Sequence, residues 1–210
     1  MKTTTIVLLT ALLMGSNVSA NINGDGTLLP YSIDTKTSKV YWTATKIGGS
    51  HTGTISIAKG TITTKNNGVY SASIVMDMKT IDNTDLDEPG YKAKLEGHLK
   101  SEDFFSVEKF PQALFEAKQF TPIKDAKTGA SNYTITGDLT IKGITHAVSF
   151  PVTVAINGNK VTTKGTLIFD RSKWNVKYGS GSFFEGLGDH LIYDDVALKF
   201  ELYASSSQVN

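Results

Sequence analysis

Four histidines are the residues of this sequence best suited to bind a metal ion or to move a proton. They are His51, His98, His146 and His190, and no two of them form the His-x-x-x-His pair of a helical zinc site. The chain also contains no cysteine. Because a zinc site needs three or four converging ligands, we expect no metal and no other cofactor.

A second polar group could supply an acid and a base. Asp170 and Arg171 lie at the end of one expected strand, and Asp189, Asp194 and Asp195 lie near the start of another. Charged residues beside strands commonly lie in solvent or form rim ion pairs worth about 0 to 1 kcal/mol. No serine, cysteine or lysine stands in a nucleophile motif. We therefore expect no catalytic residue and predict that the protein is not an enzyme.

The segments that must position these residues alternate apolar and polar side chains, which is typical of half-buried strands. The clearest alternation covers residues 133–141, 148–156 and 160–170. Weaker alternation covers residues 38–47, 52–64, 69–78, 112–120 and 192–202. Asn67-Gly68 favours a hairpin turn, because both residues tolerate positive φ.

About eight strands joined mostly by hairpins predict an all-β fold. An open sheet of this size leaves two exposed edges, and closure into a barrel removes them. We therefore expect an eight-stranded antiparallel barrel, whose interior is either filled by its own side chains or holds one small ligand. A β-sandwich stays open as the alternative, because alternation alone does not separate the two folds.

One helical insertion, at about residues 89–106, interrupts the strand pattern. One face of it carries Tyr91, Leu95, His98 and Leu99. Ser101 can cap a second short turn that presents Phe104 and Phe105. Because these rings need an apolar surface to cover, we expect the insertion to plug one end of the barrel. A second pair, Phe183 and Phe184, is either core or a second lid.

Several motifs resemble the signature of YceI-like proteins. They are Gly-His-Leu-Lys-Ser-Glu-Asp-Phe-Phe at 97–105, Val-Glu-Lys-Phe-Pro at 107–111, Gly-Asp-Leu-Thr-Ile-Lys-Gly-Ile-Thr at 137–145, Asp-Arg-Ser-Lys-Trp-Asn-Val-Lys-Tyr-Gly-Ser at 170–180, and Trp42 with His51 and Gly53. The resemblance extends from about Tyr31 to Tyr203 and implies a lipocalin-like barrel that binds polyisoprenoid lipids. Ser106 departs from the pattern, since many members have Asp there.

The expected lipid-binding residues belong to the insertion and to the inward phase of the strands. They are Leu95, His98, Leu99, Phe104, Phe105, Tyr133, Ile135, Gly137, Leu139, Phe150, Val152, Val154, Leu198 and Phe200. His98 is either a hydrogen-bonding core residue or a donor to the polar head of the lipid. Gly137 and Gly165 fall in the inward phase, where a glycine either borders a ligand cavity or marks a barrel corner.

The start of the chain has the order of a signal peptide. Lys2 is basic, residues 6–14 are mostly apolar, and Val18-Ser19-Ala20 fits a cleavage site. We expect removal of residues 1–20, a flexible leader over 21–30, the barrel over 31–204 and a tail over 205–210. The apolar run is shorter than the roughly 20 residues that span a bilayer, so no stable membrane span is expected.

The expected export and the net charge limit the classes of function that this protein can have. Loss of Lys2 leaves 20 of the 21 basic residues against 20 acidic ones, so nucleic acid is not an expected partner. We expect a periplasmic or secreted, non-catalytic protein that holds a polyisoprenoid lipid, an isoprenoid quinone or another long-chain lipid. The alternatives are a lipid-modifying enzyme that uses His98 with a carboxylate, or a structural envelope protein with a filled barrel. The sequence leaves open whether the protein forms a homodimer.

Overall fold

The computed structural model describes residues 26–66 and 68–206, so the expected signal peptide lies outside the described residues. Strands account for most of the described chain, with one α-helix and two short 3-10 turns. In chain order the elements are β1 (Leu29–Ile33), β2 (Lys39–Lys46), β3 (Gly49–Lys65), β4 (Gly68–Asn83), α1 (Pro89–Lys100), β5 (Gln112–Pro122), β6 (Tyr133–Ile141), β7 (Ile144–Asn157), β8 (Lys160–Asp170), η1 (Arg171–Trp174), η2 (Gly188–His190) and β9 (Ile192–Ser205).

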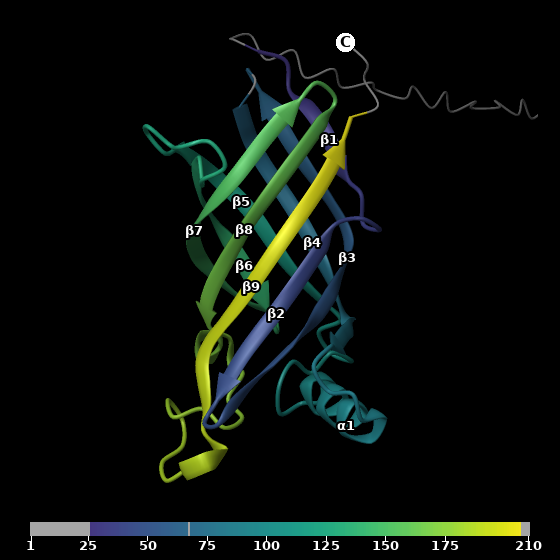
Figure 1. The fold of residues 1–210 in the computed structure, drawn as a ribbon, viewed down its shortest axis with the longest axis vertical. Coiled ribbons are helices and arrows are strands. Elements are labelled where there is room, and N and C mark those ends of the chain that lie inside the picture. Colours follow the sequence, from purple (N-terminus) through teal and green to yellow (C-terminus); the bar gives the residue numbers. More distant parts are fainter. Residues whose placement is uncertain (1–25, 67, 207–210) are drawn as a thin grey trace, which may run out of the picture.

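The strands form one antiparallel sheet that closes on itself (Figure 1). Its order runs β3-β2-β9-β8-β7-β6-β5-β4, and β4 pairs again with β3. Each strand of this ring therefore has two hydrogen-bonded neighbours, which leaves no open edge of the kind that promotes aggregation. The predicted eight-stranded antiparallel barrel is confirmed, and the sandwich alternative is wrong.

Strand β1 was not predicted from the sequence. It pairs with β3 from Leu29 to Ser32, and its end, Ser32 and Ile33, pairs with β9. Both β1 and β2 lie between β3 and β9, at different heights along the barrel axis. The ring therefore contains eight strands at any height. The segment is five residues long and contains Pro30, which gives little alternation to detect. Its first two residues fall in the range 21–30 expected to be a leader.

The two ends of the barrel differ. At the end formed by β1 and the β7–β8 hairpin, buried side chains including Tyr31, Val152 and Val161 fill the interior. At the opposite end, which we call the α1 end, α1 and the long β8–β9 connection extend beyond the strands (Figure 1). Buried apolar side chains therefore close one end of the barrel, whereas α1 and a loop lie at the other end.

Helix α1 packs against β4 at the α1 end of the barrel (Figure 1). Glu88 caps its start by accepting hydrogen bonds from the backbone N–H groups of Gly90 and Tyr91, and Pro89 occupies the first turn. No residue of α1 is buried. In the described residues, 26–66 and 68–206, no helix has the length and apolar character needed to cross a membrane.

The plug differs in part from its prediction. The helix ends at Lys100 rather than continuing to 106, because the N–H and hydroxyl of Ser101 both bond to the carbonyl of His98. The following residues form turns, in which Asp103 N–H donates to Ser101 Oγ over 3.3 Å. The predicted short turn capped by Ser101 is therefore present, but its residues are not helical. Leu99 in the last turn of α1, together with Phe104 and Phe105 in the segment after it, faces the barrel interior.

Candidate functional site

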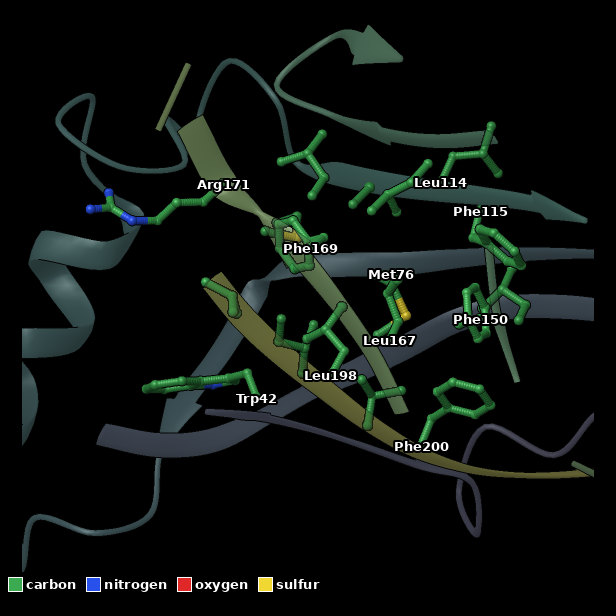
Figure 2. Close-up of a pocket in the computed structure, with 18 of the residues that line it drawn as sticks. Trp42, Met76, Leu114, Phe115, Phe150, Leu167, Phe169, Arg171, Leu198 and Phe200 are labelled. Carbon is green, nitrogen blue, oxygen red and sulfur yellow. The ribbon is translucent and has the colours of Figure 1, made fainter. Parts of the chain in front are cut away.

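A cavity of about 170 Å³ lies inside the barrel. One buried water needs roughly 10–15 Å³ on this scale, so the space is about ten times larger than a water site. All eight strands of the ring line it, together with Leu99, Phe104 and Phe105 from the plug segment. Figure 2 shows Trp42 and Arg171 at one end of the cavity and Phe115, Phe150 and Phe200 at the other.

The cavity wall is almost wholly apolar. Among its 32 residues, Arg171 is the one charged side chain and Thr163 the one hydroxyl. The described residues also contain no group of three histidines or acids placed to hold a metal ion. An interior of this kind accommodates hydrocarbon, because removing apolar surface from water contributes about 25 cal/mol per Å².

Eight of the predicted lipid-binding residues lie in the cavity wall. They are Leu99, Phe104, Phe105, Ile135, Leu139, Phe150, Leu198 and Phe200. The other six, which do not line the cavity, are Leu95, His98, Tyr133, Gly137, Val152 and Val154. Val152 and Val154 are buried in the filled end of the barrel, and Leu95 is half-buried on α1. Lipid contact stays a prediction for the whole set.

Trp42, Met76, Phe115, Phe169 and Arg171 line the cavity and were absent from the predicted set. Met76 and Phe169 point inward in the alternation of the expected strands 69–78 and 160–170. The alternation was therefore sufficient to identify these two residues. No alternation signal could have found Arg171, because it follows the last residue of β8.

His98 lies outside the cavity wall. Its ring makes edge contacts with Phe104 and Tyr178, at centroid distances of 4.9 and 4.4 Å. Its Nε2 lies 3.3 Å from Asp103 Oδ2, and its side chain is 34% exposed. The expectation of a buried core histidine is therefore wrong. His98 packs against the outer side of Phe104, which itself lines the cavity.

Arg171 is buried, with 2% of its surface exposed. Its Nε, Nη1 and Nη2 donate to the carbonyl oxygens of Tyr193, Val176 and Ile192, over 3.3, 2.8 and 3.0 Å. Its Nη2 also lies 3.3 Å from Asp194 Oδ1. Burial lowers the pKa of Arg171 from its usual value, and Asp194 opposes that shift.

The expectation of solvated or rim charges is therefore wrong for Arg171, which holds both ends of the β8–β9 connection to the barrel. Asp170 has a local role instead: it caps η1 by accepting from Ser172 N–H over 2.9 Å. The carboxylate of Asp194 accepts hydrogen bonds at Oδ2 from the hydroxyls of Ser180 and Ser182. This connection is thus held by a polar network beside an apolar cavity.

The second phenylalanine pair does not line the cavity. Phe183 and Phe184 are 41% and 49% exposed on the β8–β9 connection. Lys177 Nζ lies 4.8 Å from the centroid of the Phe183 ring. Nothing in these contacts supports a lid formed by this pair, whereas Phe104 and Phe105 do line the cavity.

Comparison with known proteins places the chain in a family. The family model of the YceI-like domain matches residues 31–204. The chain belongs to the YceI-like family. The predicted resemblance is confirmed, and the matched region extends from β1 to β9.

Solved structures share this YceI-like fold. BcnA of Burkholderia cenocepacia is 29% identical with a TM-score of 0.63, over 82% of this chain and 99% of that one. A polyisoprenoid binding domain from Saccharophagus degradans, implicated in plant cell wall breakdown, is 15% identical with a TM-score of 0.58, over 85% and 99%. A UPF0312 protein of Yersinia enterocolitica is 30% identical over 45% of this chain, and the match spans only 43% of that relative.

Gly137 does not border the cavity. A Cβ there would lie 2.3 Å from the carbonyl oxygen of Glu116, on β5. The β5–β6 register shifts beside it, between Ala117 and Gln119. Gly137 therefore allows two strands to approach at a bulge, which supports the corner interpretation. At Gly165 the space is taken by the ring of Phe200, 2.8 Å from an added Cβ.

We expect Gly137→Ala to lower the free energy of unfolding by about 1–3 kcal/mol, because the methyl group would clash with backbone that cannot move freely. Gly97→Ala is the matched control, since an added Cβ there meets nothing within 4 Å and alanine favours a helix. Urea denaturation of both variants measures the difference. Equal stability of Gly137→Ala and the wild type would contradict the corner interpretation.

The YceI-like motif of Trp42, His51 and Gly53 anchors the segment that leads to α1. A Cβ on Gly53 would lie 2.5 Å from the Trp42 ring, so only glycine lets the ring lie there. Trp42 Nε1 donates to the carbonyl of Asp82 over 3.2 Å. His51 Nδ1 lies 2.8 Å from Asp85 Oδ2. The histidine of the motif thus has a structural partner.

Asp85 also accepts hydrogen bonds from Thr52 N–H and from Asn83 Nδ2, over 2.7 and 2.6 Å. Partial burial acts to raise the pKa of Asp85, but hydrogen bonds from Thr52, His51 and Asn83 outweigh it and lower the pKa. A carboxylate with a lowered folded-state pKa stabilises the fold above its unfolded pKa of about 3.9. That stabilisation is lost as the pH falls through the folded-state pKa.

We therefore expect Asp85→Asn to flatten the acid limb of the stability curve. The free energy of unfolding should fall less steeply than in the wild type as the pH drops below about 4. Asp87→Asn is the control, because Asp87 is exposed in the same loop. Denaturation at a series of pH values measures the slopes. Parallel acid limbs for wild type and Asp85→Asn would show that the carboxylate contributes nothing.

Proposed function

We propose that this protein is an exported, non-catalytic binding protein that holds one long apolar molecule inside its barrel. The ligand class is a polyisoprenoid lipid or an isoprenoid quinone. The observation that carries the proposal is the cavity: a closed ring of strands surrounds about 170 Å³ of space with an almost wholly apolar wall. Each buried methylene contributes about 0.8 kcal/mol, so several prenyl units bind without a charged anchor.

The ligand class draws support from the structural neighbours. The Saccharophagus degradans domain with the same fold is described as binding polyisoprenoids. The cavity also has an elongated set of lining residues, running from Trp42 and Arg171 to Phe150 and Phe200 (Figure 2). A flexible chain of repeated apolar units suits a space of that form. Membership of the YceI-like family is consistent with the same class.

The two alternatives have less support. A filled barrel would pack its interior to crystal-like density with few voids larger than a water, and this cavity exceeds that by about tenfold. A lipid-modifying enzyme using His98 has a candidate carboxylate in Asp103, but the pair lies outside the cavity wall. A ligand in the cavity would be separated from it by Phe104. We therefore favour binding without catalysis.

Export, oligomeric state and further partners belong to the same proposal. Export rests on the pattern of residues 1–20, and the balanced charge of the remaining chain gives no reason to expect nucleic acid. A periplasmic or secreted protein that binds lipid needs no membrane span. A homodimer is compatible with this function.

Fluorescence tests the proposal, because the ring of Trp42 lines the cavity. An isoprenoid quinone bound inside should quench tryptophan emission and saturate at one ligand per chain. A matched quinone that lacks the isoprenoid tail is the control and should quench weakly without saturation. Equal, unsaturated quenching by the two quinones would contradict binding in the barrel.

A further inference from the structure

Exposed apolar side chains gather at the α1 end of the barrel, where α1 and the β8–β9 connection extend beyond the strands (Figure 1). Ten large apolar side chains of the described residues are exposed, and six of them lie at this end. They are Ile47 on the β2–β3 hairpin, Tyr91 on α1, Tyr178, Phe183 and Phe184 on the connection, and Tyr193 at the start of β9. Apolar residues exposed singly need no explanation, whereas a group of them at one end indicates an interaction surface.

A hydrogen-bonded turn holds two of these rings outward. The N–H groups of Phe183 and Phe184 both donate to the carbonyl of Ser180, over 3.2 and 3.1 Å. The hydroxyls of Ser180 and Ser182 donate to Oδ2 of Asp194, over 2.9 and 2.7 Å, and fix the turn to β9. Exposure of two adjacent phenyl rings to water costs free energy, because apolar surface favours burial. The turn nevertheless presents both rings to the exterior.

Positive charge lies beside these rings. Lys177 Nζ lies 4.8 Å from the centroid of the Phe183 ring, and Lys142 Nζ donates to the carbonyl of Asn175 over 3.0 Å. Burial and the nearby charge of Lys177 both lower the pKa of Lys142. Neither lysine forms an ion pair with an acidic side chain of the described residues. Two neighbouring cations without a carboxylate partner favour an anionic binding partner.

This charged and aromatic surface adjoins the plug. The ring of Tyr178 lies 5.3 Å from that of Phe104, which lines the cavity. Two exposed acids of the connection, Glu185 and Asp189, come after the phenylalanine pair in the sequence. The positive charge therefore belongs to the start of the connection, at the mouth of the barrel.

We propose that the β8–β9 connection docks on a phospholipid bilayer with anionic headgroups. Phe183 and Phe184 enter the boundary between headgroups and acyl chains, and Lys142 and Lys177 contact the headgroup phosphates. Aromatic side chains favour that boundary, and an anionic surface attracts lysine. Docking brings the plug against the bilayer, so that a lipid passes between membrane and cavity without crossing water. That last step rests on the proposed function, whereas docking itself does not.

Co-sedimentation with phosphatidylcholine vesicles, with and without phosphatidylglycerol, tests the docking surface. The wild type should bind the vesicles that contain phosphatidylglycerol about tenfold more tightly, and added salt should weaken that binding. Lys142→Gln combined with Lys177→Gln should lower the partition coefficient about tenfold or more. Phe183→Ser combined with Phe184→Ser should lower it by a similar factor, because less apolar surface leaves water.

Tyr70→Ser and Lys160→Gln are the matched controls, because both side chains are exposed at the opposite, filled end of the barrel. Both variants should bind vesicles as the wild type does. Phe183→Trp gives a direct readout of the contact, since Trp42 and Trp174 are buried. Emission of the added tryptophan should shift to shorter wavelength when anionic vesicles are supplied, because its ring leaves water.

The outcomes separate docking from ligand binding. A wild type that binds neither kind of vesicle overturns the docking surface, while the quinone titration in solution decides the proposed function by itself. Equal binding to both kinds of vesicle overturns the assignment to an anionic surface. Vesicle binding that survives both double substitutions places the contact on another face. Self-association of the wild type without vesicles, abolished by the double phenylalanine substitution, would assign the surface to a second copy of this chain instead of a bilayer.

Discussion

Replacement of Arg171 by methionine is expected to lower the free energy of unfolding by about 3–5 kcal/mol. The change leaves the carboxylate of Asp194 buried without its cation and removes donors from three carbonyls, those of Tyr193, Val176 and Ile192. Methionine fills a similar volume, so the loss reports hydrogen bonds and charge rather than a cavity. Urea denaturation of the ligand-free protein measures the effect.

Lys173→Met is the matched control, because Lys173 lies two residues further along the same connection and is exposed. It should change stability by less than about 0.5 kcal/mol. Adding Asp194→Asn to Arg171→Met should recover part of the loss, since no unpaired charge then remains buried. Unchanged stability in Arg171→Met would show that the β8–β9 connection does not depend on this clamp.

Ala72→Phe is expected to abolish much of the ligand affinity at little cost in stability. Ala72 lies on β4 in the cavity wall, so the larger ring would occupy space that the ligand uses. Displacing two or three methylenes from apolar contact costs about 2 kcal/mol, which is roughly a 30-fold loss of affinity. Titration with an isoprenoid quinone, together with urea denaturation of the empty protein, measures both effects.

The control is Ala155→Phe, because Ala155 is exposed on β7 and outside the cavity wall. It should bind the quinone as the wild type does. If Ala72→Phe instead unfolds at much lower urea while ligand affinity per folded molecule is retained, Ala72 packs in a filled interior. That result would favour the structural alternative over ligand binding.

The sequence allowed the barrel to be predicted because its strands carry period-two alternation. Residues 133–141 and 160–170 correspond to β6 and β8 at both ends. Strand β1 could not be predicted in the same way. It is short, contains Pro30, and is defined by pairing with β3 and β9, which are distant in sequence. Only the folded barrel supplies those partners.

The candidate site was predicted in part, for similar reasons. Ile135, Leu139 and Phe150 were found from the inward phase of their strands and line the cavity. The same phase also selected Val152 and Val154, because alternation does not tell where along the barrel the interior is filled.

Helical spacing placed His98 on the apolar face of the insertion, but α1 buries none of its residues and the His98 side chain is partly exposed beside Asp103. Arg171 was assigned to the rim because a charge beside a strand usually lies in solvent. Its burial depends on carbonyls from β9 and from the loop before it, which come together only in the folded chain. Neither position follows from local sequence.

Native mass spectrometry of the protein, isolated from its source without detergent, tests the central claim most directly. The account predicts a chain that carries one additional mass, released on unfolding and identified as a polyisoprenoid lipid or an isoprenoid quinone. Ala72→Phe isolated in the same way should carry much less of it, and Ala155→Phe should carry as much as the wild type. A wild-type chain that shows only its own mass, and still takes up no isoprenoid when one is supplied, would contradict the account.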